Sequence, residues 1–349
     1  MMEIGRGVLI EPRLTDQRST SPFRLWGLLY VRTGKDEEGQ RVNRPKITVI
    51  GSINMDLVTE TSRVPDLGET VLGTRFSTHP GGKGANQAVA CARLGADVTM
   101  VGCVGDDPFG KELRENLRKQ GVAVSHVDSV SGEATGVASI VVEQGDNSII
   151  VVPGANHAVT PEKVGQAEEA IREADVVLLQ LEIPIDAVAE AVGIARRHQV
   201  PVVLNPAPAM ELSRELLDGV SILTPNEYEL AVLLGQDKEQ EADFRRMLAV
   251  YPGQVVMTKG GEGAFYTGEE QQVFHQPGFP VEVVDTTGAG DTFNAALALK
   301  VGQGEGLAEA VRYATAASAL SVTRFGAQGG MPHAVQVEAF LRRGEWECP

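Results

Sequence analysis

Cysteine, histidine and aromatic residues are scarce in this sequence, and it contains no long hydrophobic run. The three cysteines, Cys91, Cys103 and Cys348, do not have the spacing of metal ligands. We therefore interpret them as two buried thiols and one tail residue in a reducing cytosol. The six histidines include no pair at ligand spacing, and no apolar run reaches the ~18–20 residues that a membrane span requires. These scarcities argue against a cysteine–histidine metal centre and against a membrane protein.

Positive charge is also in short supply. With 31 lysines and arginines against 47 aspartates and glutamates, the formal net charge is −16, which argues against a nucleic-acid-binding surface. An anionic substrate must then be held locally, by helix N-termini, a few cations and metal ions. The 349 residues, 42% of them hydrophobic, suit one large α/β domain with a small accessory element, or two domains.

The first 45 residues differ from the rest of the chain. They carry a balance of +2, which leaves −18 for the remainder, and they lack sustained periodicity or a segment typical of a signal peptide. We expect residues 1–45 to be a disordered extension outside the fold; a short docking or targeting segment is the alternative. The folded domain would cover residues 46–342, and 343–349 would form a tail.

The most informative stretch is residues 281–296, Val-Glu-Val-Val-Asp-Thr-Thr-Gly-Ala-Gly-Asp-Thr-Phe-Asn-Ala-Ala. It predicts a strand that stops at Asp285, a glycine-containing turn, and a helix from about Thr292. Small residues allow close approach to the backbone, and the first N–H groups of a helix lack intrahelical partners, so the turn favours phosphate or a developing anion. Asp291 beside it could deprotonate a hydroxyl that attacks phosphorus. Alternatively, it could simply cap the helix.

Two segments nearer the N-terminus also place polar groups where a ligand would bind. Residues 47–51 predict a buried parallel strand, and Asn54 and Asp56 follow it, where open α/β sheets bind ligands. Two residues apart in an extended segment, they would point the same way and suit a polyol, although either could form an Asx turn instead. Residues 81–86, Gly-Gly-Lys-Gly-Ala-Asn, open a predicted helix and again allow close backbone approach.

The remaining pattern predicts an α/β fold. Strands over 68–80, 134–143 and 148–152 would form a small antiparallel sheet, suited to be a lid or a dimer surface, with the lid strands within about 55–80 and 134–152. From residue 161 onward strands and helices alternate strictly, and polar or glycine residues end each strand. This alternation predicts a mostly parallel central sheet with helices on both faces and one ligand edge.

One motif is a look-alike. Residues 105–111 have the G-x4-G-K spacing of a phosphate-binding loop, but Glu112 occupies the position of its metal-binding serine or threonine. We interpret this segment as an ordinary turn between a strand and a helix.

Five segments together resemble the PfkB family of carbohydrate and nucleoside kinases. They are residues 51–56 (Gly-Ser-Ile-Asn-Met-Asp), 80–86 (Pro-Gly-Gly-Lys-Gly-Ala-Asn), 224–229 (Thr-Pro-Asn-Glu-Tyr-Glu), 258–263 (Thr-Lys-Gly-Gly-Glu-Gly) and 285–294 (Asp-Thr-Thr-Gly-Ala-Gly-Asp-Thr-Phe-Asn). The resemblance covers about residues 46–342, with both family signatures in order. The last segment is similar to the family as a whole, and the first two favour its ribokinase branch.

The resemblance implies a role for each matching position. Asp291 would take the proton from the sugar 5-hydroxyl, and the backbone of Gly288, Ala289 and Gly290 would form the anion hole. The sugar would be held by residues of the first two segments and of one strand end: Asn54, Met55, Asp56, Gly82, Lys83, Gly84, Ala85, Asn86 and Glu182.

The resemblance also implies sites for ATP and for ions. The ATP cleft would be lined by Asn226, Thr258, Lys259, Gly260, Gly261, Glu262, Gly263 and Thr315, with Gly290 and Asp291 at its phosphate end. Glu229, with Asn226, would organise Mg²⁺ through water. A monovalent cation, usually K⁺ in the family, would lie among Asp285, Thr287, Ser321, Arg324, Gly326 and Gly330. Two positions depart from the family pattern, since Gly330 falls where a serine is common and Thr315 where the family often has asparagine or histidine.

We therefore expect an ATP-dependent kinase that converts D-ribose to D-ribose 5-phosphate and works in the cytosol as a homodimer paired through the small sheet. A kinase of the same family for deoxyribose, fructose, keto-deoxygluconate or a nucleoside is the first alternative. Near the sugar motifs, however, no extra cation for a sugar acid and no aromatic partner for a nucleoside stands out. A sugar-binding regulatory protein without catalysis is the second alternative. A nicotinamide-dependent dehydrogenase is the third, and it is weak because no G-x-G-x-x-G follows the first strand.

Overall fold

The computed structural model describes residues 34–35, 41–42, 44–143, 146–235, 248, 253–268 and 271–343. Most of the predicted N-terminal extension and residues 344–349 of the predicted tail lie outside the described residues. Within the first 45 residues, β1 (Gly34–Lys35) and β2 (Arg41–Val42) pair as short antiparallel strands. A search of the described helices finds none that is long and apolar enough to cross a membrane.

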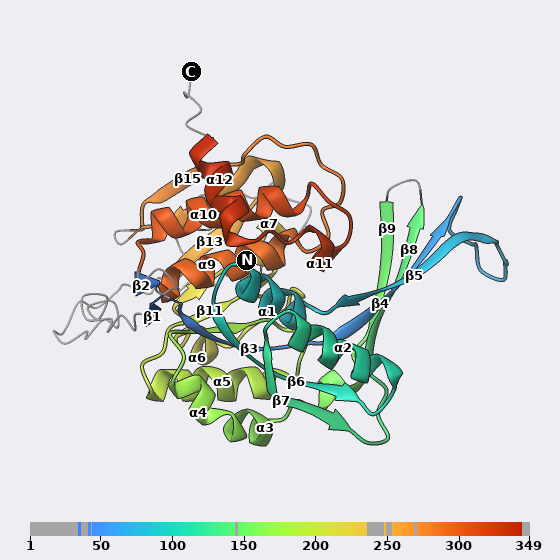
Figure 1. The fold of residues 1–349 in the computed structure, drawn as a ribbon, viewed down its shortest axis with the longest axis horizontal. Helices are drawn as coiled ribbons and strands as arrows, with labels where there is room; N and C mark the ends of the chain where they lie inside the picture. The colour runs from blue at the N-terminus through green and yellow to red at the C-terminus, as the bar shows by residue number, and fades with distance from the viewer. Residues whose placement is uncertain are drawn as a thin grey trace, which may run out of the picture. The chain divides into compact units, whose positions relative to one another are not determined.

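A mostly parallel sheet lies at the centre of the described chain, as the sequence predicts, and it has nine strands (Figure 1). Its strands are, in spatial order, β15 (Val273–Pro277), β14 (Gly263–Thr267), β13 (Gln254–Thr258), β12 (Ile222–Leu223), β11 (Val202–Leu204), β10 (Val176–Leu179), β3 (Lys46–Ile50), β6 (Asp97–Gly105) and β7 (Ala123–Val130). The strands from β13 to β7 are parallel to one another, and β14 and β15 form an antiparallel hairpin at the other edge.

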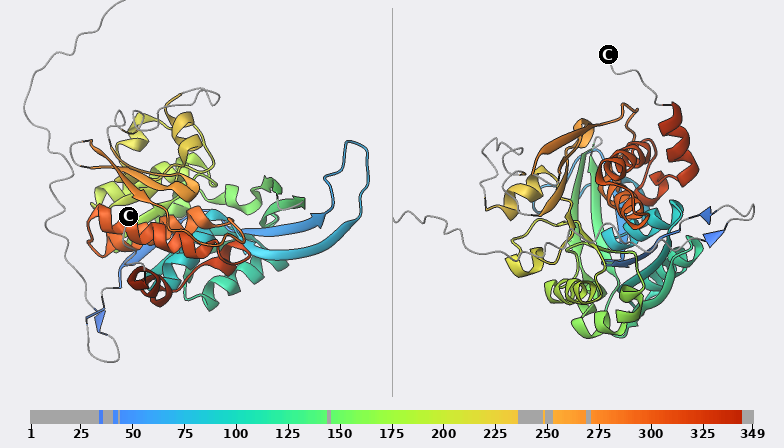
Figure 2. Two further views of the ribbon diagram at one scale, coloured as in Figure 1. Left: turned by 90° about the horizontal axis from the view of Figure 1, so that it is seen from above. Right: turned by 90° about the vertical axis from the view of Figure 1, so that its left-hand side faces the viewer.

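Helices cover both faces of this sheet (Figure 2). Because successive side chains of a strand point to opposite faces, Ile47 and Val49 of β3 join one hydrophobic core, and Ile50 joins the other. The first core is closed by α1 (Lys83–Arg93), α2 (Pro108–Lys119), α9 (Ala289–Gly302), α10 (Leu307–Ser321) and α12 (Ala334–Arg343). The second is closed by α3 (Pro161–Gln166), α4 (Glu168–Arg172), α5 (Ile185–Arg197), α6 (Arg214–Leu217) and α7 (Glu227–Leu233). The short α11 (Ala327–Gly330) follows α10.

The predicted small sheet has four strands in the order β5 (Gly73–Gly81), β4 (Asn54–Thr61), β8 (Gly136–Glu143) and β9 (Asp146–Val152). Two antiparallel hairpins, β4–β5 and β8–β9, join through a parallel β4–β8 pair. The sheet was expected to be antiparallel throughout, and this one pair differs from that expectation. The reason is its connection to the central sheet. β4 follows β3 and β8 follows β7, and both leave the same edge of a parallel sheet in the same direction.

Three local predictions need correction or confirmation. Residues 281–284 do not form a strand, because the N–H groups of Val284 and Asp285 both donate to one carbonyl, that of Val322, instead of pairing along a ladder. The strict alternation after residue 161 is interrupted by the β14–β15 hairpin. The turn at 105–111 is confirmed as a helix start: Asp107 is the N-cap of α2 and accepts a hydrogen bond from the Gly110 N–H (2.7 Å).

Candidate active site

The start of α9 holds the predicted catalytic residue in a buried polar setting. Asp291 is 7% exposed. Its Oδ2 accepts a hydrogen bond from Asn86 Nδ2 (2.9 Å), and its Oδ1 accepts one from Gln87 Nε2 (3.1 Å). Burial raises the pKa of Asp291, whereas Lys83 and these two amides lower it. The capping alternative is wrong, because Gly288 holds the N-cap position of α9 and the Asp291 carboxylate bonds to α1 instead.

The turn before α9 is suited to bind an anion. Gly288 has a φ of 77°, and a Cβ there would lie 3.0 Å from the first residue of α11, so glycine is required. The Ala289 N–H closes the turn onto the Thr286 carbonyl (3.2 Å), whereas the Gly290 N–H comes at a position without an intrahelical acceptor. A Cβ built on Gly290 would meet nothing within 4 Å. Of the three predicted anion-hole residues, Gly290 is thus the best placed, and Ala289 is already engaged.

The polar residues predicted to hold a sugar gather at the junction of β4, β10 and α1. Asn54 is buried, and its Oδ1 accepts a hydrogen bond from Asn156 Nδ2 (2.7 Å). Glu182, which follows β10, accepts hydrogen bonds from Ser52 Oγ (2.5 Å) and from the Lys83 N–H (3.3 Å). These contacts bring the two predicted sugar motifs and the predicted strand end to one place.

The glycines of the segment 81–86 let α1 pack against the end of β3. Gly82 has a φ of 87°, and a Cβ on Gly84 would lie 2.6 Å from the carbonyl carbon of Gly51. Met55 and Ala85 are buried in the hydrophobic core. Their side chains therefore pack in that core, and only their backbone is available to a ligand.

Five charged side chains influence one another across the site. Burial and the nearby carboxylates of Glu182 and Asp291 raise the pKa of Asp56 to about 7. Burial also raises the pKa of Glu229. Burial by itself would lower the pKa of Lys83, but the Asp291, Glu182 and Glu229 carboxylates raise it above its ordinary value. Lys83 therefore remains a cation among four carboxyl groups.

Asn226 and Glu229 form a capping box at the start of α7. The Asn226 side chain accepts a hydrogen bond from the Glu229 N–H, and Glu229 Oε2 accepts one from the Asn226 N–H, both at 2.8 Å. Thr258 at the end of β13 pairs with Asn226 through an isolated bridge, which brings the predicted ATP segments together. Thr315 is buried in α10, and its hydroxyl donates to a carbonyl of its own helix (2.8 Å).

The loop after β13 combines a closed end and an open end. Gly263 has a φ of 95°, and a Cβ on it would lie 2.2 Å from the carbonyl oxygen of β15 residue Gln276. A Cβ on Gly260 or Gly261 would meet nothing within 4 Å. Lys259 and Glu262 of the same loop form an ion pair (2.9 Å). The two open glycines are therefore free to border a ligand.

Asp285 organises the loop predicted to hold a monovalent cation. Its Oδ1 accepts hydrogen bonds from the Thr287 N–H (2.9 Å) and hydroxyl (2.7 Å), and its Oδ2 accepts one from the Gly326 N–H (2.8 Å). Burial would raise the pKa of Asp285, but these three hydrogen bonds hold it below its ordinary value. The carboxylate thus ties the start of α9 to the start of α11.

The departure at Gly330 has a steric reason. A Cβ there would lie 2.1 Å from the carbonyl oxygen of Ser321 and 3.4 Å from that of Arg324. A serine would clash unless the Ser321 carbonyl moved. Three of the predicted cation ligands therefore lie side by side, and glycine is the residue that this backbone accepts.

Sequence reasoning missed two buried amide residues behind Asp291, Gln87 and Gln180. Gln87 and Gln180 are fully buried, and Gln180 Nε2 donates to Gln87 Oε1. Gln87 Nε2 also lies 3.4 Å from Asn205 Oδ1. We refer to Gln87, Gln180 and Asn205 as the buried amide chain. A signal was available, since Gln87 is followed by the apolar residues 88–92 of a helix that must pack on the sheet.

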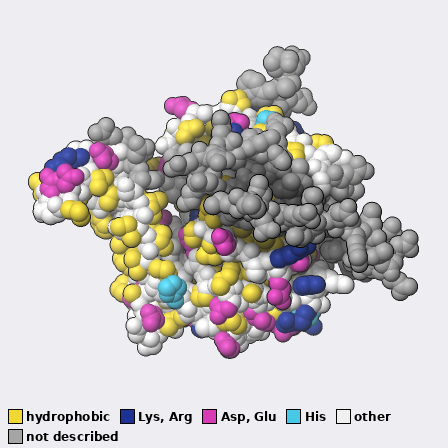
Figure 3. Space-filling model, turned by 180° about the vertical axis from the view of Figure 1, so that it is seen from behind, with side chains coloured by type: hydrophobic (Ala, Val, Ile, Leu, Met, Phe, Trp, Pro, Cys, Tyr) yellow, Lys and Arg dark blue, Asp and Glu magenta, His cyan; other side chains and the backbone are white. Residues whose placement is uncertain are grey.

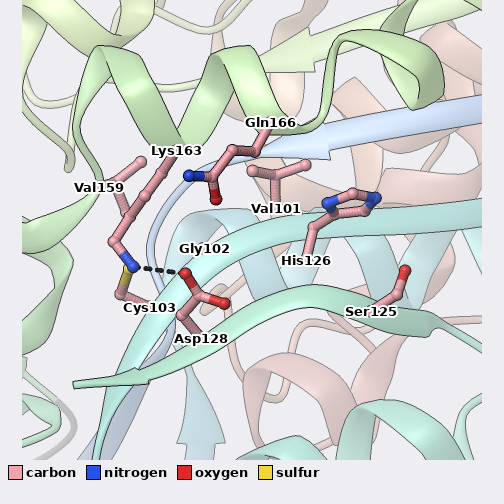
Figure 4. A pocket seen from close by; sticks show the side chains of 9 residues that line it. All are labelled: Val101, Gly102, Cys103, Ser125, His126, Asp128, Val159, Lys163 and Gln166. Carbon is pink, nitrogen blue, oxygen red and sulfur yellow. Dashed lines mark hydrogen bonds and ion pairs between the residues drawn. The ribbon is translucent and has the colours of Figure 1, made fainter. Parts of the chain in front are cut away.

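Figure 4 shows a separate cavity. It has a volume of about 220 Å³ and lies between β6, β7 and α3. In it Lys163 forms an ion pair with Asp128, next to the buried thiol of Cys103. None of its lining residues belongs to the predicted site.

Comparison with known proteins identifies the family. The model of the pfkB family of carbohydrate kinases matches residues 44–334. Ribokinase of Bacillus subtilis is 49% identical over 295 residues, which cover 84% of this chain and 99% of that protein. A structure of Arabidopsis thaliana ribokinase complexed with ribose and ATP is 37% identical, with a TM-score of 0.80, and covers 86% of this chain and 99% of that one. A putative ribokinase II from E. coli in complex with ATP and Mg²⁺ is 25% identical, with a TM-score of 0.70 over 86% and 99% of the two chains. This chain therefore belongs to the PfkB family of carbohydrate kinases.

Proposed function

We propose that this chain transfers the γ-phosphoryl group of ATP to the 5-hydroxyl of D-ribose and releases D-ribose 5-phosphate. The observation that carries this proposal is the position of Asp291. Its buried carboxylate lies one residue after Gly290, whose N–H belongs to the first turn of α9, so that a base and a candidate anion site share that turn. The high identity to ribokinases over nearly their whole length supports ribose as the substrate.

Phosphoryl transfer requires positioning and electrostatic stabilisation more than covalent chemistry. Asn54, Asp56 and Glu182 offer the oxygen and amide groups that bind a polyol. Asp291 would accept the proton of the attacking hydroxyl, and the Gly290 N–H would donate to the transferring group. Lys83, held protonated by its carboxylate neighbours, would offset the charge of the phosphates.

The donor set of this site fits Mg²⁺ held through water. Glu229 uses Oε2 for the capping box, so that Oε1 can accept a hydrogen bond from a water in the metal's shell. When bound, Mg²⁺ neutralises charge on the phosphates of ATP. We assign the adenosine end to the open loop at Gly260 and Gly261. A monovalent cation would be bound by the backbone carbonyls gathered near Gly330, with Asp285 fixing the loop around it.

A homodimer paired through the small sheet is also part of the proposal. Hydrophobic side chains extend along the projecting four-stranded arm (Figure 3). On its edge strand β9, Ile149, Ile150, Val151 and Val152 are 52%, 69%, 44% and 53% exposed, and Phe76 of β5 is 64% exposed. An uncovered apolar edge strand promotes aggregation, so that proteins generally cover it.

The two described cysteines, Cys91 and Cys103, are free thiols, which is consistent with action in the cytosol.

The test is ATP-dependent phosphorylation of a panel containing ribose, deoxyribose, fructose, keto-deoxygluconate and adenosine, with Mg²⁺ and with or without K⁺. We expect ribose to be preferred, K⁺ to raise the rate, and the Asp291→Asn variant to lose about 10²–10⁴-fold in kcat. Preference for another member of the panel would move the substrate assignment and keep the mechanism. Ribose binding without turnover of any member would contradict the enzyme and favour a sugar sensor.

A further inference from the structure

The catalytic carboxylate is held from one helix and supported by two strand ends. Both donors to Asp291 come from consecutive residues of α1, Asn86 and Gln87. Behind Gln87 stand Gln180, the residue after β10, and Asn205, the residue after β11. Gln87 and Gln180 are 0% exposed and Asn205 is 7% exposed. Water therefore has little access to the buried amide chain, and its members must bond to one another.

The ionised carboxylate dictates the direction of this chain. It can only accept hydrogen bonds, so Gln87 must present its NH₂ group to Asp291 and its Oε1 to Gln180. Gln180 must then donate through Nε2. Its own Oε1 is left buried and without a hydrogen-bond partner among the described residues. Such an orphaned oxygen is unfavourable, and it follows from the orientation that Asp291 imposes.

We propose that Gln87 is a positioning residue for the catalytic base. By donating to Oδ1, it holds the Asp291 carboxylate ionised and in one rotamer, ready for the sugar hydroxyl. A neutral carboxyl is a weaker acceptor, so the hydrogen bond from Gln87 favours the charged form that the reaction requires. This inference rests on the proposed function, in which Asp291 is the base.

The need for such a donor follows from the surrounding charges. Asp56 of β4, Glu182 after β10 and Glu229 of α7 all disfavour a further negative charge, and Lys83 of α1 favours it. Burial adds to the disfavour. The amides of Asn86 and Gln87 supply the remaining stabilisation. Asn86 is also expected to bind the sugar. Gln87 is fully buried behind Asp291, so its expected role is limited to the hydrogen bond that it donates to this carboxylate.

The test is the pH profile of kcat, measured at saturating D-ribose and MgATP for the wild type and for Gln87→Met, which removes the donor and keeps the volume. Asp291 must be ionised, so kcat falls as the pH drops through its pKa, and losing a donor raises that pKa. We expect the acid limb to move up by about one pH unit, so that at pH values below both pKa values kcat is about 10-fold lower in the variant. The KM for ribose should change by less than about 3-fold, because Gln87 does not touch the sugar.

Two further variants separate positioning from a general disturbance of the core. Gln180→Met lies in the same buried chain but keeps the Gln87–Asp291 hydrogen bond, so its acid limb should stay near the wild-type position. Gln87→Glu replaces the donor by a like charge and should move the limb further than Gln87→Met. An equal shift in Gln180→Met, or an unmoved limb in Gln87→Met, overturns the inference. If Gln87→Met fails to fold, an unmoved limb in Gln87→Glu overturns it. A wild type that does not phosphorylate ribose would instead contradict the proposed function.

Discussion

Asp56 carries a cost in stability that its proposed role in binding the sugar would explain. Its pKa rises from 3.8 to about 7 on folding. Between these two pH values the native chain keeps a proton that the unfolded chain has lost, so stability falls as the pH rises through this window. At pH 8 the full rise in the pKa of Asp56 lowers the free energy of unfolding by about 4 kcal/mol. About 1.5 kcal/mol of this loss is already present at pH 5. Asp56→Asn removes this titration and keeps the shape of the side chain.

The assay is urea unfolding of the wild type and Asp56→Asn at pH 5 and at pH 8, with Asp97→Asn as an exposed control. We expect the free energy of unfolding of Asp56→Asn, relative to that of the wild type, to be about 2.5 kcal/mol higher at pH 8 than at pH 5. For the control this difference should not change between the two pH values. In the same variant the KM for ribose should rise by more than about 10-fold. The amide NH₂ of asparagine cannot accept the hydrogen bond that a carboxylate oxygen accepts, and a polar group left unpaired in the bound state weakens binding. A stability difference that is the same at both pH values would refute the proposed pKa and its cause.

Two more substitutions test the anion site and the dimer. Gly288→Ala places a side chain at a φ of 77° and 3.0 Å from α11, so kcat should fall by more than about 10-fold and the free energy of unfolding by about 1–3 kcal/mol. Kinetics and urea unfolding check it, with Gly290→Ala, which has open space for a Cβ, as the stability control. Ile150→Glu puts a charge on the exposed edge strand of the arm and should shift the mass measured by light scattering from dimer to monomer. An unchanged mass, or a wild type that is already monomeric, would contradict the dimer.

The mostly parallel central sheet and its ligand edge were largely predictable because they depend on short-range patterns. Apolar runs of four or five residues, each followed by a polar or glycine residue, are sufficient to predict parallel strands and a ligand edge. The β14–β15 hairpin and the parallel β4–β8 pair were not predictable in this way. Strand direction in these pairs is decided by which elements are neighbours in space, and the local pattern does not contain that information.

The candidate site shows the same division. Glycines at 82, 84 and 288 are readable because their backbone positions exclude a side chain. The strand expected over 281–284 was wrong because a β-rich composition does not provide a partner, and here only the Val322 carbonyl is offered. Gln87 and Gln180 were overlooked because they lie 93 residues apart in the sequence. A buried amide shows its purpose only when its partner is known.

The strand β4 belongs both to the four-stranded arm and to the candidate site, and this couples movement of the arm to the site. It is a central strand of the four-stranded arm, and it also carries Asn54 and Asp56. A motion of the arm that included the start of β4 would move these two side chains relative to Asp291, which is held on α9. In such an open state the chain would lack part of its proposed sugar site. Binding of the sugar and closure of the arm would then be coupled. A molecule that cannot hydrogen-bond to Asp56 would not stabilise the closed state.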